Sequence, residues 1–238
     1  MGQTLRELTL LDLAIALVPV VIVGFIAARW LANSRQVAWA AGRMLLQLLL
    51  VGYVLQHIFA QDSQPLSLGI LLLMIVISSA IALRPIPNKQ ANHWWATLLA
   101  IGIGGSVNLA LVVALFSGGS DWHNPHTLIP MAGMVYANCM NAVSLGAERY
   151  GSELEREQGF LQARNLAFGA AMLPQINSLL AVGLVSLPGM MTGQILSGIS
   201  PLVAARYQIV VMCMIFGSAG ISTAVYLWWM GRSALKFE

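Results

Sequence analysis

The sequence predicts an all-α, polytopic membrane protein. Hydrophobic residues make up 58% of its 238 residues and charged residues only 9%, whereas a soluble domain carries about 25% charged residues. So few charges cannot cover the water-facing surface of a chain of this length. The polar stretches between the apolar segments are all short, so residues 1–238 are expected to form a single transmembrane domain.

About seven apolar segments are long enough to span a bilayer, because a helix needs about 20 apolar residues to cross the hydrocarbon core. The predicted spans are 9–28, 44–60, 66–83, 95–116, 127–147, 166–187 and 207–230. Residues 188–205 are expected to form a re-entrant or looped element between the last two spans.

This element belongs to an uncharged run from Asn165 to Ala205, which is too long for one ordinary membrane helix. Prolines and glycines interrupt the run at Pro174, Pro188, Gly189, Gly193, Gly198 and Pro201. Lipid-facing backbone cannot leave N–H and C=O groups unpaired, so irregular backbone is tolerated only inside a protein or along a cavity. In transporters such elements often lie near the permeation path, and we expect the same here.

The distribution of basic residues predicts the orientation. Ten of the twelve Lys and Arg residues fall in loops on one side or in the C-terminal tail. These ten are Arg29, Arg35, Arg43, Arg84, Lys89, Arg149, Arg156, Arg164, Arg232 and Lys236, and the other two are Arg6 and Arg206. Because basic loops stay in the cytoplasm, we expect the N-terminus outside and the C-terminus in the cytoplasm, which an odd number of spans allows.

Sequence motifs for catalysis are missing. The chain contains no GxxxxGK[ST], HExxH or GxSxG pattern, which excludes ATP hydrolysis by a P-loop mechanism, and no catalytic residue is predicted. The small net charge of +3 gives no support to nucleic-acid binding. Active transport by this chain therefore requires energy from a partner or from an ion gradient.

Three segments carry a specific family resemblance. They are GRMLLQLLLVGYVLQHIF at 42–59, IPMAGMVYANCMN at 129–141 and VGLVSLPGMMTGQILSGISPLVAARYQIVVM at 182–212. Together they resemble the permease subunit of Fet-type iron-export ABC transporters, the FetB family. The resemblance runs over most of the chain, and LPGMMTGQI followed by ARYQ is its most specific part.

This resemblance implies that residues 1–238 form a transmembrane permease domain that dimerises with a second copy in the bacterial cytoplasmic (inner) membrane. It also implies binding to a separate cytoplasmic ATPase of the FetA type. ATP is then bound and hydrolysed on that partner, so this chain is expected to bind no cofactor of its own. Export of a metal ion, with iron as the first candidate, is the implied role.

Candidates for the transport pathway come from these motifs, because polar groups inside membrane spans cost free energy unless they are paired. The candidates are Arg43, Gln47, Asn138, Asn141, Met190, Met191, Gln194, Arg206 and Gln208. Interhelical hydrogen bonding is the alternative explanation for the amides and core packing for the methionines. For Arg206 the alternatives are contact with lipid headgroups and an ion pair with Asp62 or Asp121.

The longest polar stretch, 148–164, is expected to form a short cytoplasmic helix or turn. Its candidates for contact with the ATPase are Glu155, Glu157, Phe160 and Leu161, with Phe160 and Leu161 entering a cleft on the partner. FetB-type permeases usually carry a longer segment here. The short segment leaves open a simple solvated face, or an ATPase-independent carrier or pore built on the same scaffold.

A metal site is the last candidate. Asp121, His123 and His126 form a DxHxxH pattern in the loop that is predicted to lie outside. Imidazole and carboxylate ligands suit iron, zinc or nickel, so this cluster could bind a metal at the exit of the pathway. The alternative is a loop with histidines that bind no metal.

Overall fold

The computed structural model describes residues 9–30, 35–61, 63–86, 91–117, 123–156 and 159–234, and these residues are helical apart from short turns. The chain divides into two compact units, Met1–Gln61 and Asp62–Glu238, and each is described by itself. Six helical segments are long and apolar enough to cross a membrane. The all-α, multi-pass architecture predicted from composition is therefore confirmed.

The first unit contains α1 (Leu10–Ala16), α2 (Val18–Trp30) and α3 (Arg35–Gln61). A capping box begins α1, because Asp12 N donates to Thr9 Oγ1 at 3.3 Å while Thr9 N donates to the Asp12 carboxylate at 2.9 Å. Pro19 has no N–H and so weakens the helical hydrogen bonding between α1 and α2, which together make one candidate span. Nearly all apolar side chains of this unit are exposed, as helices that contact lipid require.

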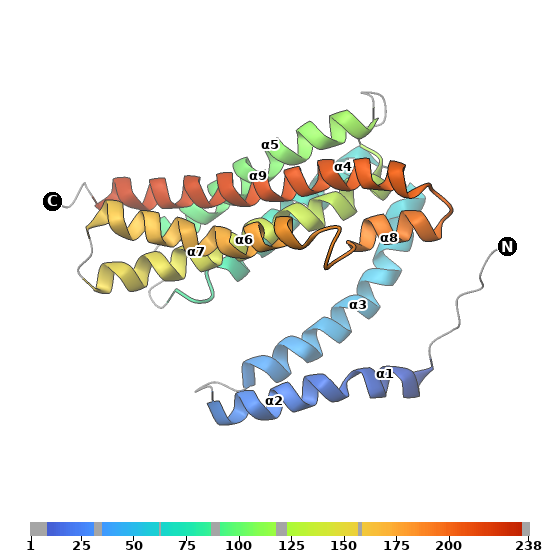
Figure 1. The fold of residues 1–238 in the computed structure, drawn as a ribbon, viewed down its shortest axis with the longest axis horizontal. Coiled ribbons are helices and arrows are strands. Elements are labelled where there is room, and N and C mark those ends of the chain that lie inside the picture. The colour runs from blue at the N-terminus through green and yellow to red at the C-terminus, as the bar shows by residue number, and fades with distance from the viewer. Residues whose placement is uncertain are drawn as a thin grey trace. The chain divides into compact units, whose positions relative to one another are not determined.

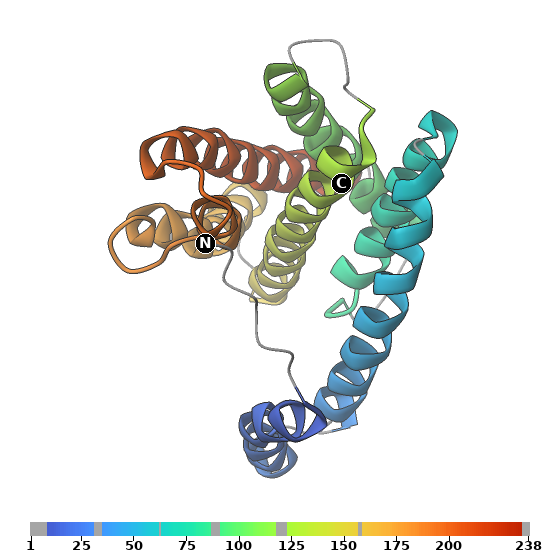
Figure 2. The ribbon, with the colours of Figure 1, turned by 90° about the vertical axis from the view of Figure 1, so that its right-hand side faces the viewer.

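The second unit is a helical bundle with α6 at its centre (Figure 1). Its helices are α4 (Gln64–Ala82), α5 (Ala91–Ser117), α6 (Pro125–Glu155), α7 (Phe160–Ala181), α8 (Gly189–Leu196) and α9 (Pro201–Ala234). α6 packs against α4, α5, α7 and α9, and Figure 2 shows it between α4 and α7. A proline stands in the first turn of α4, α6 and α9, where its missing N–H would have had no intrahelical acceptor.

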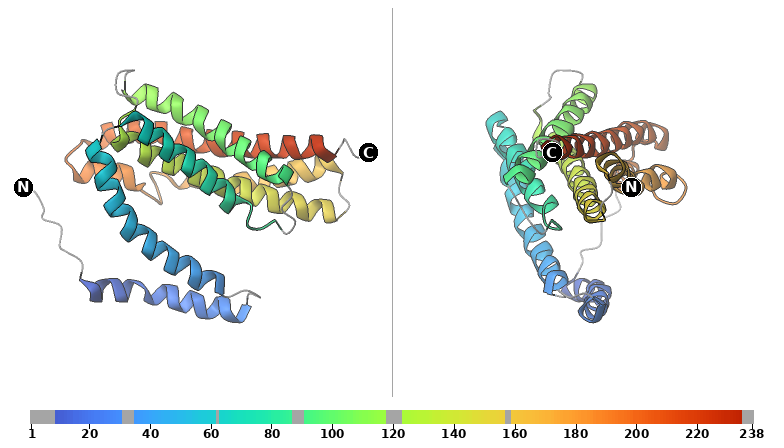
Figure 3. Two further views of the ribbon diagram at one scale, coloured as in Figure 1. Left: turned by 180° about the vertical axis from the view of Figure 1, so that it is seen from behind. Right: turned by 90° about the vertical axis from the view of Figure 1, so that its left-hand side faces the viewer.

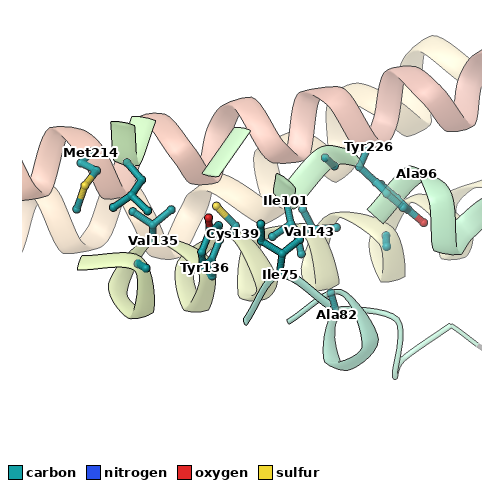
Figure 4. Close-up of a cluster of buried hydrophobic side chains, with 14 of the residues drawn as sticks. Ile75, Ala82, Ala96, Ile101, Val135, Tyr136, Cys139, Val143, Met214 and Tyr226 are labelled. Carbon is teal, nitrogen blue, oxygen red and sulfur yellow. The ribbon is translucent and has the colours of Figure 1, made fainter. Parts of the chain in front are cut away.

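The core of the bundle lies where α5, α6 and α9 meet, and small residues let these backbones approach closely. Gly104 of α5 lies against the backbone of Ser222 of α9, and Gly105 lies against the Tyr136 ring of α6. Figure 4 shows Tyr136 within a buried cluster to which α4, α5, α6 and α9 all contribute. The Tyr136 hydroxyl and Ser106 Oγ form a hydrogen bond of 3.0 Å, so this buried phenol has a partner.

α6 is longer than the predicted span 127–147. It continues to Glu155, through the first half of the polar stretch that was predicted to be a separate short helix or turn. Two contacts explain the extension. Tyr150 is still buried in the bundle, and Arg149 forms an ion pair with Glu153, one helical turn further on, at 2.7 Å.

Two other helices begin earlier than hydropathy alone indicates. α3 begins at Arg35, so Arg43 lies inside a helix and not in the first loop as predicted. α9 begins at Pro201, so Arg206 and Gln208 lie on its first turns. Backbone hydrogen bonding continues through polar residues wherever φ and ψ remain helical, so the apolar length of a segment underestimates its helix.

Between α7 and α9 the chain is irregular, and the irregular element covers 182–200 rather than the predicted 188–205. α7 ends at Ala181, six residues before the predicted end of the sixth span. In the turn that follows, Gly183 has a φ of +83° and its N–H donates to Ser186 O at 2.9 Å. The short helix α8 comes next, and a second turn, with Gly198 at a φ of +91°, leads into α9. Such φ values favour glycine, which has no Cβ. Figure 3 shows α8 at one end of the bundle.

Replacing Gly104 by Ala is expected to lower the melting temperature. The added Cβ would lie 2.7 Å from Ser222 N, a backbone atom that cannot rotate away. Overpacking of this kind costs about 1–3 kcal/mol. The control is Gly102→Ala, whose Cβ would meet only Ile75 Cγ2 at 3.8 Å. Thermal unfolding in detergent should separate the two variants, and equal melting temperatures would contradict the close approach of α5 and α9.

Candidate functional site

The pathway candidates are distributed over four helices, and the structure brings only some of them together. In the first unit they lie on α3, and in the second unit on α6, α8 and α9. The assignments are Arg43 and Gln47 on α3, Asn138 and Asn141 on α6, Met190, Met191 and Gln194 on α8, and Arg206 and Gln208 on α9.

Met190 and Gln194 of α8 share a pocket of about 430 Å³ at the end of the bundle where α8 lies. The other lining residues come from the ends of α5, α6 and α9 and are Val113, Phe116, Asn124, Thr127 and Tyr207. The Gln194 Oε1 atom is buried and accepts no hydrogen bond from the described residues. Burying a polar atom without a partner costs free energy, so this oxygen is available to a ligand or a water molecule in the pocket.

Every described residue that lines this α8-end pocket is uncharged. Its polar groups are amides, hydroxyls and the thioether of Met190, while the Phe116 and Tyr207 rings pack edge to face with centroids 4.9 Å apart. Sites with an apolar wall and a few polar groups are typical of small-molecule binding. The pocket is therefore the best-formed candidate for a substrate contact among the predicted pathway residues.

Tyr207 was missed by the sequence analysis, although it stands between Arg206 and Gln208 in the ARYQ motif. Successive residues of a helix point in different directions, and the structure separates these three. Tyr207 lines the pocket, Arg206 is exposed, and Gln208 is 5% exposed with its Oε1 unpartnered among the described residues. The ARYQ motif could have identified Tyr207. Selection by polarity instead chose Arg206 and Gln208, the residues on either side of it.

Asn138 forms an interhelical hydrogen bond, which was the alternative explanation for the amides. Gln175 Nε2 of α7 donates to Asn138 Oδ1 at 3.3 Å, and Asn138 Nδ2 donates to Met134 O at 2.8 Å. Gln175 is buried, so the pair joins α6 to α7 inside the bundle. Asn141, one turn further along α6, is exposed and remains a pathway candidate.

Arg43 and Gln47 form a pair on α3. With the Gln47 amide turned so that its oxygen faces the guanidinium, Arg43 Nε and Nη2 donate to it at 3.0 and 3.2 Å. Both residues are exposed within the first unit. This arginine therefore has an uncharged amide as its partner.

The ATPase-contact candidates gather where α6 ends and α7 begins. Glu155 is exposed, Leu161 is 62% exposed, and Glu157 lies outside the described residues. Phe160 is less available than predicted, because its ring packs against Gly231 of α9 and lies edge-on to Tyr150 with centroids 6.2 Å apart. Leu161 is thus an outward-facing apolar residue of this end, more exposed than Leu154 at 40%.

Glu153 is a further residue at this end that the sequence analysis missed. Its carboxylate is 4% exposed and is held by Arg149 at 2.7 Å and by Arg156 at 3.5 Å. The i,i+4 spacing of Arg149 and Glu153 was a readable signal. Beside this ion pair lies a pocket of about 460 Å³, whose wall includes Glu148 and Glu155, so this end of the bundle is charged where the α8 end is neutral.

The DxHxxH pattern stays a prediction, because Asp121 lies outside the described residues. His123 and His126 flank the start of α6, where His126 N donates to the Asn124 side chain at 3.0 Å and so caps the helix. Across the described parts of the chain, no group of three or more His, Cys, Asp or Glu side chains is arranged to hold a metal ion.

Helices of this length and apolarity define a multi-pass membrane protein. The chain matches the family described as "Uncharacterised protein family (UPF0014)" over residues 10–235, and it belongs to that family. The resemblance to FetB-type proteins found in the three sequence motifs is confirmed by this match together with the 35% identity to a FetB protein.

Individual relatives are similar over most of their length. "Probable iron export permease protein FetB" of Escherichia coli is 35% identical over 90% of this chain and 87% of its own. "UPF0014 membrane protein slr1647" of Synechocystis is 33% identical over 79% and 78%. "Protein ALUMINUM SENSITIVE 3" of Arabidopsis thaliana is 30% identical over 84% and 78%. No solved structure matches the chain.

Two glutamine substitutions should separate structural from functional amides. Gln175→Leu removes the hydrogen bond to Asn138 and should lower the melting temperature, because an interhelical bond of this kind contributes about 0.6–2 kcal/mol and Asn138 Oδ1 loses its donor. Gln194→Leu removes an oxygen that has no described partner, so the melting temperature should hold while transport falls. Loss of stability in Gln194→Leu together with unchanged transport would assign Gln194 to packing.

Proposed function

We propose that this protein is the permease subunit of an ABC-type transporter that exports a metal ion, iron in the first instance, with energy from a separate ATPase. The observation that carries the proposal is the match to FetB, a probable iron export permease, over 90% of the chain. Three motif segments and six candidate spans support it. In this proposal α7 is a seventh crossing, which the opposite locations of the two termini require. The location is the bacterial cytoplasmic (inner) membrane, with the N-terminus outside and the C-terminus in the cytoplasm.

In this proposal the two ends of the bundle have different functions. The positive-inside distribution puts the charged end, with Glu155 and Leu161, in the cytoplasm, where the ATPase contacts it. The neutral α8-end pocket then opens toward the outer side, where the substrate leaves. The different functions of the two ends are supported by the charge of their pockets. The pocket at the cytoplasmic end includes Glu148 and Glu155, whereas the described lining of the α8-end pocket is uncharged.

A homodimer is supported by the irregular element that follows α7. Leu184 and Val185 are 91% and 85% exposed in the single chain. Irregular backbone does not face lipid within the hydrocarbon core, so a second copy that covers this turn would satisfy the constraint. The transport pathway then lies between the two copies, as the family resemblance implies.

An ATPase-independent carrier or pore is the second candidate. The observation that favours it is the short connection between α6, which ends at Glu155, and α7, which begins at Phe160. So short a connection offers little surface to a partner beyond the helix ends themselves.

Leu161→Glu should weaken ATPase binding at least tenfold, because it places a charge where we propose an apolar contact. The control is Gln162→Glu, which introduces the same charge at the neighbouring exposed position of α7 and should keep binding. Both are measured by co-purification and by stimulation of ATP hydrolysis in proteoliposomes.

If the wild-type permease transports iron but no ATPase binds it, the carrier replaces the ABC permease as the function. If both glutamate variants bind like wild type, the ATPase contact lies elsewhere on the permease.

A further inference from the structure

Polar side chains of α3 gather in one sector of the helix, which they share with the apolar side chains of Trp39, Leu46, Leu50 and Val54. At 100° per residue, six polar side chains fall within a sector of about 120°. They are Arg35, Gln36, Arg43, Gln47, Tyr53 and His57. Gln56 lies on the opposite face beside Leu45, Leu49 and Gly52. We call the sector the polar face of α3.

The polar face must be covered by water or protein. α3 is a candidate membrane span, and within its unit it packs against α2. Ionisable and amide side chains in a span almost always face a bundle interior or a water-filled cavity. The polar face is therefore better explained as a surface of the transport pathway than as a surface that contacts lipid.

Arg43 lies too deep in α3 to be an ordinary interface residue. It stands eight residues inside a helix of 27 residues, which places it about 7 Å within a 30 Å hydrocarbon core if the helix is centred. A snorkelling arginine would extend back toward the nearer end of the helix, at Arg35. The guanidinium instead binds the amide of Gln47, which stands one helical turn further in.

Within the first unit, Arg43 has no carboxylate partner among the described residues. Residues 13–61 include Arg29, Arg35 and Arg43 but no Asp or Glu. Two of its five N–H donors bind Gln47, so three remain for a ligand. Arg29 differs, because its guanidinium stacks on the Phe25 ring at 4.7 Å near the end of α2.

A bare metal cation is a poor match for this surface. Iron cations prefer carboxylate, imidazole or thiolate ligands in groups, and the described residues hold no such group. Arg43 would also repel them. An oxyanion fits far better, because the guanidinium fork binds carboxylate or phosphate oxygens through two parallel hydrogen bonds, and the amides of Gln36 and Gln47 can donate to the same oxygens.

We propose that the polar face of α3 binds an anion, and that the metal crosses the membrane as an anionic complex whose organic ligand carries the negative charge. This deepens the proposed function, on which it rests for the identity of the metal. Arg43 binds the oxyanion and Gln47 holds the guanidinium toward the middle of the helix.

The test uses the full-length permease with its ATPase in proteoliposomes, and ferric citrate as the probe. Binding to the permease alone and ATP-driven uptake are both measured with radioactive iron. Arg43→Gln should weaken binding and uptake at least tenfold, and Arg43→Lys should recover part of both because it keeps the charge but not the fork. Arg29→Gln removes the same charge from a stacked site and should behave as wild type.

In the wild type, metal-free citrate should inhibit uptake of ferric citrate, while Mg²⁺ and Zn²⁺ should not. This inhibition experiment tests the proposal even if Arg43→Gln fails to fold, because it uses the wild-type protein. Uptake of free Fe²⁺ in preference to the citrate complex, or normal citrate binding by a folded Arg43→Gln protein, would overturn the anion proposal. If citrate binding depends on Arg43 but ATP drives no iron uptake, the anion site stands and the proposed function fails.

Discussion

The bundle depends on the close approach of α5 and α9. Lipid chains are as apolar as leucine, so helices in a bilayer are held by van der Waals packing and hydrogen bonds more than by burial. Gly104 opposite Ser222 brings the two backbones together, and one turn along α5 the Asn108 side chain lies over Gly217. With this spacing set, α6 packs against both helices and its Tyr136 ring reaches Ser106 of α5.

Polar side chains inside the spans fall into two groups. Ser106 with Tyr136, and Gln175 with Asn138, bind each other and join neighbouring helices. Gln194 and Arg43 differ, because Gln194 has an oxygen without a partner among the described residues and Arg43 pairs with a neutral amide. The first group explains how the helices are held together. The second group keeps hydrogen-bonding capacity that the described residues do not use, which is why the functional proposals rest on it.

Much of the fold follows from composition and hydropathy, and the errors have a common cause. The membrane class and the positions of the spans need only apolar length. The ends of α3, α6 and α9 were misplaced because hydropathy registers the bilayer and not the backbone hydrogen bonds, which continue through Arg43 and as far as Glu155. In the candidate site, polarity identified Gln194 but not Tyr207, whose role depends on the direction of its ring in α9.

By itself, the sequence determined that this is an all-helical membrane protein, that its most unusual backbone lies between α7 and α9, and that it belongs with FetB-like permeases. These properties depend on residue type and order along the chain. Only the tertiary structure decided which polar residues are satisfied and which are not. Asn138 and Gln194 look alike in the sequence, yet one meets Gln175 across a helix interface and the other meets a pocket, because a hydrogen bond depends on distance in space between segments far apart in the chain.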